Sequence, residues 1–276
     1  MDTSELREFA ENIRKRIIQT AYESKHSVYL GGAMSMVDIL AVLYGKIMRY
    51  NPQKPKSASR DRLILSKGHA CIGLYAALNL IGVISDDEMG ANYQTDGGYL
   101  TVHCEKNIGK GIECTSGSLG MGLSFGVGKA LAAKLDKKSY RVYVIVGDGE
   151  CNEGSIWEAA AAARQYLLDN LVLIIDKNKY QFDGQTKDIM DIDLNAVLTG
   201  FGWKVFNVDG NSVESLIGAF TLITKYSDGG VPCAIIANTV KGKGVSFMES
   251  DSAWHGGHLS ENQYLKVMGE LNSDRN

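Results

Sequence analysis

Proline is scarce in this sequence, with three residues in 276, and no two of its cysteines are spaced as Cys-x-x-Cys. The five cysteines are odd in number, which argues against a disulfide framework or a zinc site and favours reduced thiols. No apolar run is long enough to cross a membrane, and the N-terminal segment is charged and amphipathic, without the apolar core of a signal peptide. We therefore expect a cytoplasmic protein.

The chain also lacks an excess of positive charge. It contains 29 lysines and arginines against 32 aspartates and glutamates, for a formal net charge of −3. This balance excludes a broad basic surface for nucleic acid or anionic membrane. Apolar residues make up 45% of the chain, so one large core can form. Function must therefore come from a local site that binds small molecules.

Apolar segments alternate with helical patterns along the chain. Such alternation predicts an α/β fold with a mostly parallel sheet covered by helices on both faces. We expect one domain over residues 1–276, with an N-terminal helical segment and a C-terminal helical tail. Ser4 is the expected N-cap of the first helix, and Asn211 with Glu214 resembles a capping box. The predicted strands are 63–65, 141–146, 171–176, 203–208 and 233–238; the predicted helices are 4–22, one after Gly31-Gly32, 71–82, 119–135, 154–168 and 212–226.

The strongest chemical motif follows two of these strands. Gly147-Asp148-Gly149 ends one strand, and Asn178 follows the next strand along the chain. In a parallel strand–helix–strand unit the two strand ends lie side by side, so Asp148 and Asn178 can converge. Their side-chain oxygens, with the backbone carbonyl of Tyr180, would supply three ligands to a hard cation such as Mg²⁺ or Ca²⁺. Gly147 and Gly149 let the backbone approach a diphosphate at the start of the following helix.

Five segments, in one order along the chain, resemble motifs of the transketolase family. The segment GDGECNEGSIWEAAAAARQYLLDNLVLIIDKNKYQFDG, which begins at Gly147, resembles that family's thiamine-diphosphate motif. DRLILSKGHA at 61–70 resembles DRF-x-LSKGHA, and TSGSLGMG at 115–122 resembles TGSLGQG. NTVKGKG at 238–244 resembles KTFKGRG, and SAWHG at 252–256 resembles SWHG. The resemblance covers roughly residues 10–260.

This resemblance implies a thiamine-diphosphate-binding fold and a divalent cation. It covers only the family's first domain, whereas a full transketolase is more than twice as long. The family's pyrimidine-binding domain, which carries the glutamate that activates the cofactor, has no counterpart in this chain. The resemblance therefore implies the N-terminal subunit of a split transketolase that works with a pyrimidine-domain partner, as an α2β2 heterotetramer.

The resemblance also assigns roles to several side chains. His69 would approach the diphosphate and the thiazolium ring, with Lys67 nearby, and Lys241 would contact the diphosphate. His103 would hydrogen-bond the donor's first hydroxyl, and His255 would lie near the reacting carbon and move protons. The plain alternatives are a satisfied polar histidine for His69 and a solvated loop lysine for Lys241.

Further cofactor contacts are implied along the glycine-rich loops. Gly117, Ser118 and Leu119 would meet the aminopyrimidine, and Glu150 would lie by the diphosphate through its backbone N–H. Glu153 matches a family glutamate at the subunit interface, although a first-turn carboxylate can equally serve a helix N-terminus. Cys151 has nothing nearby that would activate it, and we regard it as a spacer. His258 matches no position of the family.

One position departs from the family pattern. Transketolases carry Gly-His-Pro-Gly near the first pair of helices, and alignment on Gly31-Gly32 places Tyr29 at the position of that histidine. His26 lies three residues earlier. Tyrosine offers one hydroxyl and more bulk, and the loop 91–112 also differs from the family. The identity of the substrates is therefore undetermined, whereas the resemblance still implies binding of thiamine diphosphate.

Three functions fit these observations. The first is transfer of a two-carbon ketol unit from a ketose to an aldehyde. The second keeps the cofactor but uses a 2-oxo acid such as pyruvate as donor, either on this scaffold or as the α-subunit of a 2-oxo acid dehydrogenase. The third is a non-catalytic domain that binds the metal diphosphate. The motifs at 61–70, 115–122 and 238–256 favour the first.

Overall fold

Five parallel strands form one sheet in the order β1-β2-β3-β5-β4 in the computed structural model, which describes residues 1–226 and 229–273. Every neighbouring pair in this sheet is parallel. The strands are β1 (Arg62–Leu65), β2 (Val142–Gly147), β3 (Leu171–Lys177), β4 (Lys204–Asp209) and β5 (Cys233–Asn238). The predicted α/β fold is confirmed, and all five predicted strands exist to within a residue or two.

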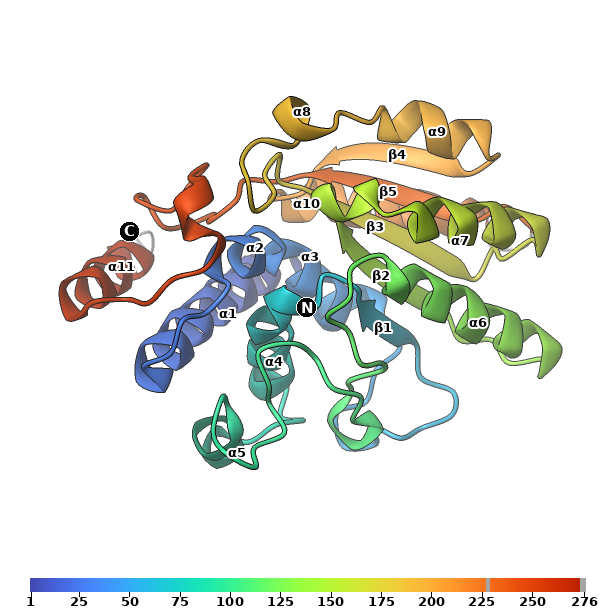
Figure 1. The fold of residues 1–276 in the computed structure, drawn as a ribbon. Coiled ribbons are helices and arrows are strands. Elements are labelled where there is room, and N and C mark those ends of the chain that lie inside the picture. The colour runs from blue at the N-terminus through green and yellow to red at the C-terminus, as the bar shows by residue number, and fades with distance from the viewer. Residues whose placement is uncertain (227–228, 274–276) are drawn as a thin grey trace.

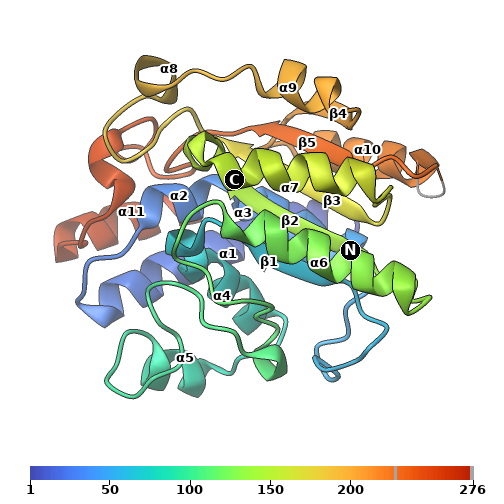
Figure 2. The ribbon, with the colours of Figure 1, turned by 45° about the vertical axis from the view of Figure 1, so that its right-hand side comes forward.

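Helices cover both faces of the sheet (Figure 1). Helices α6, α7 and α9 lie on one face, and α1, α3, α4 and α10 lie on the other, as the rotated view also shows (Figure 2). The helices are α1 (Thr3–Ser24), α2 (Leu30–Ser35), α3 (Val37–Val42), α4 (Cys71–Leu80), α5 (Asp86–Asn92), α6 (Met121–Leu135), α7 (Gly154–Gln165), α8 (Thr186–Ile189), α9 (Leu194–Gly200), α10 (Val213–Ile223) and α11 (Glu261–Ser273).

Successive side chains of each strand enter two different cores. On β2, Tyr143 and Ile145 pack with the α1, α4 and α10 side, whereas Val144 and Val146 pack with the α6 and α7 side. This follows from the two-residue period of a strand. Because both faces of the central strands β2, β3 and β5 are buried, these strands are largely apolar instead of alternating with polar residues. The edge strand β4 is the exception, since it carries Lys204, Asn207 and Asp209 and is only partly buried. Each fully buried aliphatic side chain contributes roughly 1.5–3 kcal/mol.

The two predicted helix caps are wrong. Asp2, not Ser4, caps α1: its carboxylate accepts from the backbone N–H of Glu5 at 2.9 Å, and Glu5 accepts from the N–H of Asp2. At α10 the cap is Ser212, whose hydroxyl accepts from the N–H of Ser215. The side chain of Asn211 instead makes hydrogen bonds to residues far away in the sequence.

Asn211 ties three distant segments together. Its amide donates to Asp38 Oδ2 at 2.9 Å and to the carbonyl of Ser35, and its oxygen accepts from the N–H of Val240 at 2.8 Å. These bonds join α10 to the region of α2 and α3 and to the end of β5. One capping bond contributes less than these three partly buried bonds together, so the local pattern was misleading.

The single helix predicted after Gly31-Gly32 is divided in the structure: α2 contains both glycines and ends at Ser35, and α3 begins at Val37. A Cβ on Gly31 would come within 2.6 Å of the backbone oxygen of Trp254, and one on Gly32 would lie 3.4 Å from His69 Nε2. These glycines therefore allow close approach instead of forming a turn. After α3 the chain continues as a π-helical turn over Leu43–Ile47.

Three short helices were not predicted: α5, α8 and α9. Ser85 caps α5 in a full capping box with Glu88, a pattern that was visible in the sequence. The predicted C-terminal helical tail exists as α11, which packs against α1. Within the described residues, no helix has both the length and the apolar composition that a membrane crossing requires.

Candidate active site

The candidate site lies where β2 and β3 end. Gly147 pairs with Asp176 in the parallel register, so the residues that follow each strand emerge side by side. A cavity of about 270 Å³ opens at this edge, where parallel sheets commonly bind ligands. The structure thus brings the two predicted strand ends together. The cavity is lined by Gly32, Lys67, His69, Leu119, Gly147, Asp148, Gly149, Glu150, Asn152, Glu153, Asn178, Tyr180, Gln181, Phe182, Lys241 and His255.

Asp148 and Asn178 are both buried and face this cavity. Asp148 accepts from the N–H of Gly149 at 3.0 Å and from the N–H of Lys179 at 2.7 Å. The oxygen of Asn178 accepts from the N–H of Tyr180 at 3.0 Å. Lys179 has a left-handed backbone with φ of 70°, which turns the chain between the candidate ligands Asn178 and Tyr180. Each oxygen keeps a lone pair for a cation.

Burial raises the pKa of Asp148 to about 6, and the neighbouring carboxylate of Asp176 adds to this effect. A carboxylate in such a place is costly to ionise unless a positive charge compensates it. Lys67 acts in the opposite direction and lowers this pKa. A divalent cation at Asp148 would supply the same compensation more strongly.

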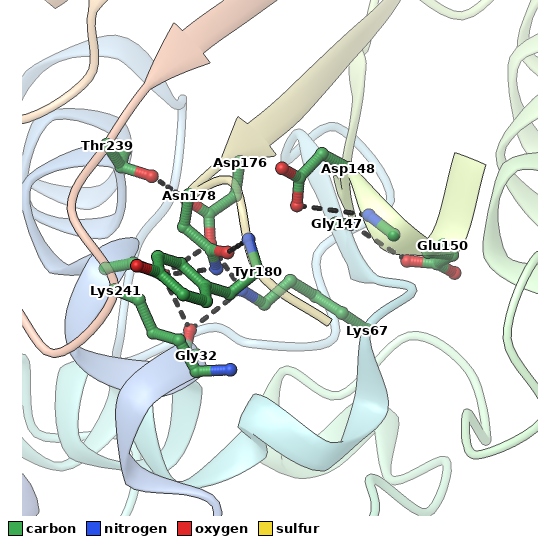
Figure 3. Close-up of polar contacts among 12 residues, drawn as sticks. Gly32, Lys67, Gly147, Asp148, Glu150, Asp176, Asn178, Tyr180, Thr239 and Lys241 are labelled. Carbon is green, nitrogen blue, oxygen red and sulfur yellow. Dashed lines mark hydrogen bonds and ion pairs between the residues drawn. The ribbon is translucent and has the colours of Figure 1, made fainter. Parts of the chain in front are cut away.

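Asp176 forms a buried hub beneath the cavity that the sequence did not single out (Figure 3). Its carboxylate accepts from the ammonium of Lys67 and from the hydroxyls of Ser35 and Thr239. Lys67 also donates to the carbonyl of Gly32 at 2.8 Å. The available signal was a carboxylate directly after five apolar residues of β3. The hub fixes α2, β3 and the ends of β1 and β5 relative to one another.

The hub also reaches a predicted metal ligand. The amide nitrogen of Asn178 lies 3.4 Å from the hydroxyl oxygen of Ser35, which itself donates to Asp176 at 2.5 Å. With its nitrogen directed at Ser35, the amide presents its oxygen away from the hub. Such outer contacts commonly orient the groups that touch a metal.

Glu150 joins three loops through its side chain. One oxygen accepts from the N–H of Gly120 at 2.8 Å and from the hydroxyl of Ser66, and the other accepts from the N–H of Gly147 at 3.0 Å. Burial raises the pKa of this carboxyl. The sequence predicted a backbone contact to diphosphate, and that contact stays a prediction. The side chain's role in positioning was missed.

Two histidines and a lysine also line the cavity. The rings of His69 and His255 stack with centroids 5.2 Å apart, and the ammonium nitrogen of Lys241 lies 3.3 Å from His255 Nδ1. Burial, with help from Lys241 and Lys67, lowers the pKa of His255 to about 4. Burial and then Lys67 also lower the pKa of His69 well below its usual value. Both imidazoles are neutral at pH 7.

The remaining predicted residues lie around the rim. His103 does not line the cavity; it packs beside Gly117, and its ring lies 5.7 Å from that of Tyr29. Gly117 and Ser118 are exposed, and Leu119 reaches the cavity. Their roles stay predictions.

Glu153 is exposed at the N-cap of α7 and makes no side-chain capping bond. Its charge still lies at the N-terminus of α7, so both interpretations of Glu153 stay predictions. Cys151 is completely buried, and burial raises the pKa of its thiol well above the usual value. A protonated, inaccessible thiol agrees with its interpretation as a spacer.

This donor set fits a metal diphosphate. Two buried lysines, Lys67 and Lys241, supply positive charge on one side, and Gly32 leaves open space that a Cβ would partly fill. Burial and the charge of Lys67 lower the pKa of Lys241 to about 8, which an anion between the two lysines would reverse. Among the described residues, no group of three or more histidines, cysteines and carboxylates could hold a metal alone. A cation here would need oxygens from Asn178, a backbone carbonyl and the diphosphate.

The His255→Gln variant is expected to reduce the pH dependence of stability. The folded pKa of His255 is held at about 4, below its ordinary value of 6.5. Between these values the unfolded chain binds more protons, so this residue lowers the free energy of unfolding as pH falls through that window. Thermal melts at pH 7 and pH 5 should show a larger loss of Tm in the wild type than in the variant.

A matched control for this test is His258→Gln, because His258 is exposed and outside the cavity. This control should keep the wild-type difference between pH 7 and pH 5. Equal pH dependence in the wild type and in His255→Gln would contradict the depressed pKa.

Comparisons with known proteins place these features in a family. A family model described as transketolase, thiamine diphosphate binding domain, matches residues 7–274. The chain is 42% identical over 275 residues to one subunit of the apulose-4-phosphate transketolase of Phocaeicola vulgatus, covering 98% of this chain and 94% of that protein. It is 39% identical over 247 residues to 6-deoxy-6-sulfo-D-fructose transketolase subunit SqwG of Clostridium sp. strain MSTE9, covering 89% of each.

Full-length transketolases are similar over one part of their length. The transketolase of Homo sapiens is 39% identical over 273 residues, which are 97% of this chain but 42% of the human protein. The solved transketolase of Leishmania mexicana superposes with a TM-score of 0.89 at 28% identity, covering 97% of this chain and 41% of that one. The chain therefore spans less than half of these full-length enzymes but nearly all of the proteins named as subunits.

Proposed function

This chain belongs to the transketolase family, and we propose that it is the N-terminal, diphosphate-binding subunit of a two-component transketolase. The assembled enzyme would move a two-carbon ketol unit from a ketose donor to an aldehyde acceptor. One observation carries the proposal: Asp148, Asn178 and two buried lysines converge in one cavity, in a chain whose length matches family members named as subunits. We also propose that the chain is a single domain and cytoplasmic.

In this proposal the residues around Asp148 bind the metal diphosphate. Asp148, Asn178 and the carbonyl of Tyr180 would hold Mg²⁺ or Ca²⁺ through oxygen. Lys67 and Lys241 would balance the charge of the diphosphate, and the backbone N–H of Glu150 would donate to it within a 3₁₀ turn. Thiamine diphosphate supplies, when bound, an electron sink for breaking the donor's carbon–carbon bond.

The histidines handle protons and orient the donor. His69 and His255 are neutral at pH 7, so each offers one N–H donor and one basic nitrogen. Lys241 beside Nδ1 favours the tautomer of His255 whose proton sits on Nε2. His255 would give this proton to the reacting oxygen while Lys241 passes a proton to Nδ1, and the reverse transfers would return it. His103 would bind the donor's first hydroxyl. The enclosing aromatic rings would limit water around these groups.

A second chain, the partner, would complete the site. Glu153 and Leu119 lie at the rim of the cavity, where another chain could reach them. Large apolar side chains are exposed just beyond, on α6: Met121 is 45% exposed and Phe125 is 47% exposed. The partner would carry the pyrimidine-binding domain, and an α2β2 assembly would contain two such sites. These features support the proposal because the Glu153 carboxylate is exposed and makes no side-chain capping bond, so it is free to contact another subunit.

The isolated chain is expected to show no transferase activity, whereas the chain mixed with its partner subunit should transfer the ketol unit. The gene adjacent to this one is the candidate source of the partner. Both proteins would be co-purified and assayed with thiamine diphosphate, Mg²⁺, a ketose and an aldehyde. Full turnover by this chain alone would contradict the split-subunit proposal. A stable complex without turnover on any donor would contradict the transferase proposal and favour the non-catalytic alternative.

Donor chemistry is the remaining alternative. The matched family is transketolase, which favours ketol transfer over the α-subunit of a 2-oxo acid dehydrogenase. Tyr29, at the position where the family has a histidine, is the observation that favours a different donor within the transketolase scaffold. Its surroundings decide what kind of donor fits.

A further inference from the structure

A second cavity of about 510 Å³ lies outside the proposed cofactor site. Phe182 lines both cavities, and His255 of the inner cavity is followed directly by Gly256 of the outer one. The two spaces therefore adjoin along one wall. The outer cavity is bounded by Tyr29, Phe182, Val102, Gln94, Ser27 and His26.

Tyr29 stands between the two spaces. Its ring lines the outer cavity and contacts three histidine rings, with centroid distances of 5.5 Å to His69, 5.7 Å to His103 and 5.5 Å to His255. Phe182 meets the ring of His255 edge-on at 5.3 Å. His26 lines the outer cavity but has no ring contact with these histidines. Tyr29, not His26, is therefore the side chain at the histidine cluster.

The backbone holds Tyr29 in this place. Val28 and Gly257 form an antiparallel bridge, with N–H to carbonyl distances of 2.8 and 3.0 Å. Helix α2 begins at the next residue after Tyr29. The ring lies against Gly256, where an added Cβ would be 3.4 Å from the ring carbon Cδ1. A side chain fixed from both ends of its segment presents a constant surface to a ligand.

The outer cavity offers hydrogen bonds without cations. None of the described residues that line it is a lysine or an arginine, whereas the inner cavity has two lysines. Its walls are two aromatic rings and Val102, with Gln94, Ser27 and His26 as polar groups. Apolar walls with a few neutral polar groups suit a hydroxyl-bearing carbon chain, whose C–H groups can lie on a ring. They do not suit a phosphate.

We propose that Tyr29 is a specificity-determining residue, whose ring and hydroxyl bind the uncharged, hydroxyl-bearing part of a ketose beyond the bond that breaks. This inference rests on the proposed ketol transfer and deepens it. The part of the ketose from C3 onward lies in the outer cavity against Tyr29 and leaves as an aldehyde. An acceptor aldehyde binds in the same place, and any anionic end is bound by the partner subunit.

Two donors distinguish binding of the leaving part of the ketose by Tyr29 from a general effect of Tyr29 on the cofactor and the histidines. In D-xylulose the C2–C3 bond breaks and C3 to C5 leave as an aldehyde, which occupies the outer cavity. In hydroxypyruvate the corresponding bond breaks with loss of CO₂, which needs no outer cavity. Both deliver the same two-carbon unit, so they share every requirement at the histidines and the cofactor. Their difference reports on the outer cavity alone.

The test measures donor consumption by the assembled two-subunit enzyme with thiamine diphosphate, Mg²⁺ and a limiting donor. Tyr29→Phe removes one hydrogen bond and should lower kcat/KM for D-xylulose about fivefold. Tyr29→Ala also removes the ring and should lower it about fiftyfold. Neither variant should change kcat/KM for hydroxypyruvate by more than about twofold, since its leaving group does not reach Tyr29.

The matched control is Tyr22→Phe, because Tyr22 stacks on Tyr264 and lines neither cavity. It should leave both donors unchanged. Cofactor binding by titration, which should stay at the wild-type level in every variant, shows that the fold survives. Equal losses with both donors, or no loss with D-xylulose, would overturn the role of Tyr29. If the wild-type pair consumed neither donor while still binding the cofactor, the proposed transfer itself would fail, and this inference with it.

Discussion

Replacement of Asp148 by alanine is expected to weaken Mg²⁺-dependent binding of thiamine diphosphate at least about a hundredfold. Among the residues that the structure describes, three carboxylates line the cavity at the ends of β2 and β3: Asp148, Glu150 and Glu153. Glu150 is engaged by three loop groups, and Glu153 is exposed at the rim. No other anionic ligand can therefore replace Asp148.

Calorimetric titration of this chain with thiamine diphosphate, with and without Mg²⁺, measures the effect directly. Asp148→Asn is the second variant, because its amide oxygen can still accept from a backbone N–H that Asp148 binds. It should fold like the wild type and still lose the metal dependence. Asp136→Ala, at an exposed site after α6, is the control and should bind normally. Unchanged affinity in Asp148→Ala would remove the central claim about the site.

The second large effect is on stability: Lys67→Met should lower the free energy of unfolding by about 3–5 kcal/mol. Lys67 is 1% exposed and pairs with Asp176, which is fully buried. Methionine fills similar space but supplies no charge, so the Asp176 carboxylate would stay buried without a cation. Ser35 and Thr239 still donate to it, yet neutral hydroxyls cannot replace the ammonium.

Urea unfolding of the protein without cofactor is the measurement, and a double variant makes it specific. Combining Lys67→Met with Asp176→Asn removes both charges, so the loss should be clearly smaller than the sum of the two single losses. Lys138→Met, at an exposed lysine, is the control and should change stability by less than about 0.5 kcal/mol. Additive single losses would show that the pair does not depend on mutual charge compensation.

Much of the sheet was predictable because its information is local. Strands β2, β3 and β5 are short, mainly apolar runs, and their two buried faces require no alternation. Asp148 and Asn178 then converge by a general rule, since neighbouring parallel strands place their carboxyl ends together. The same argument predicted the cavity's position before any distance was known.

The wrong predictions share one cause: they rest on residues adjacent in the sequence, whereas the observed structure depends on contacts with distant residues. Asn211 has the position of a cap, but three distant partners use its amide. Gly31 and Gly32 were expected before a helix, yet they lie inside α2. There the absence of a side chain lets Trp254 and His69 pack against them. The predicted backbone contact of Glu150 stays a prediction, but the hydrogen bonds of its side chain to three loops were missed because those loops are far apart in the sequence.

The cofactor motif occupies one continuous stretch of sequence, so the sequence alone was sufficient to predict that Asp148 and Asn178 converge at the ends of two neighbouring strands. The contacts that shape this site join residues far apart: Lys67 and Asp176 are 109 positions apart, and Ser35 and Asp176 are 141 apart. The same is true of Tyr29, whose place among three histidines depends on a bridge between Val28 and Gly257. Such contacts form only when helices pack on strand ends, because burial and charge pairing act through space and leave no periodic pattern in the chain.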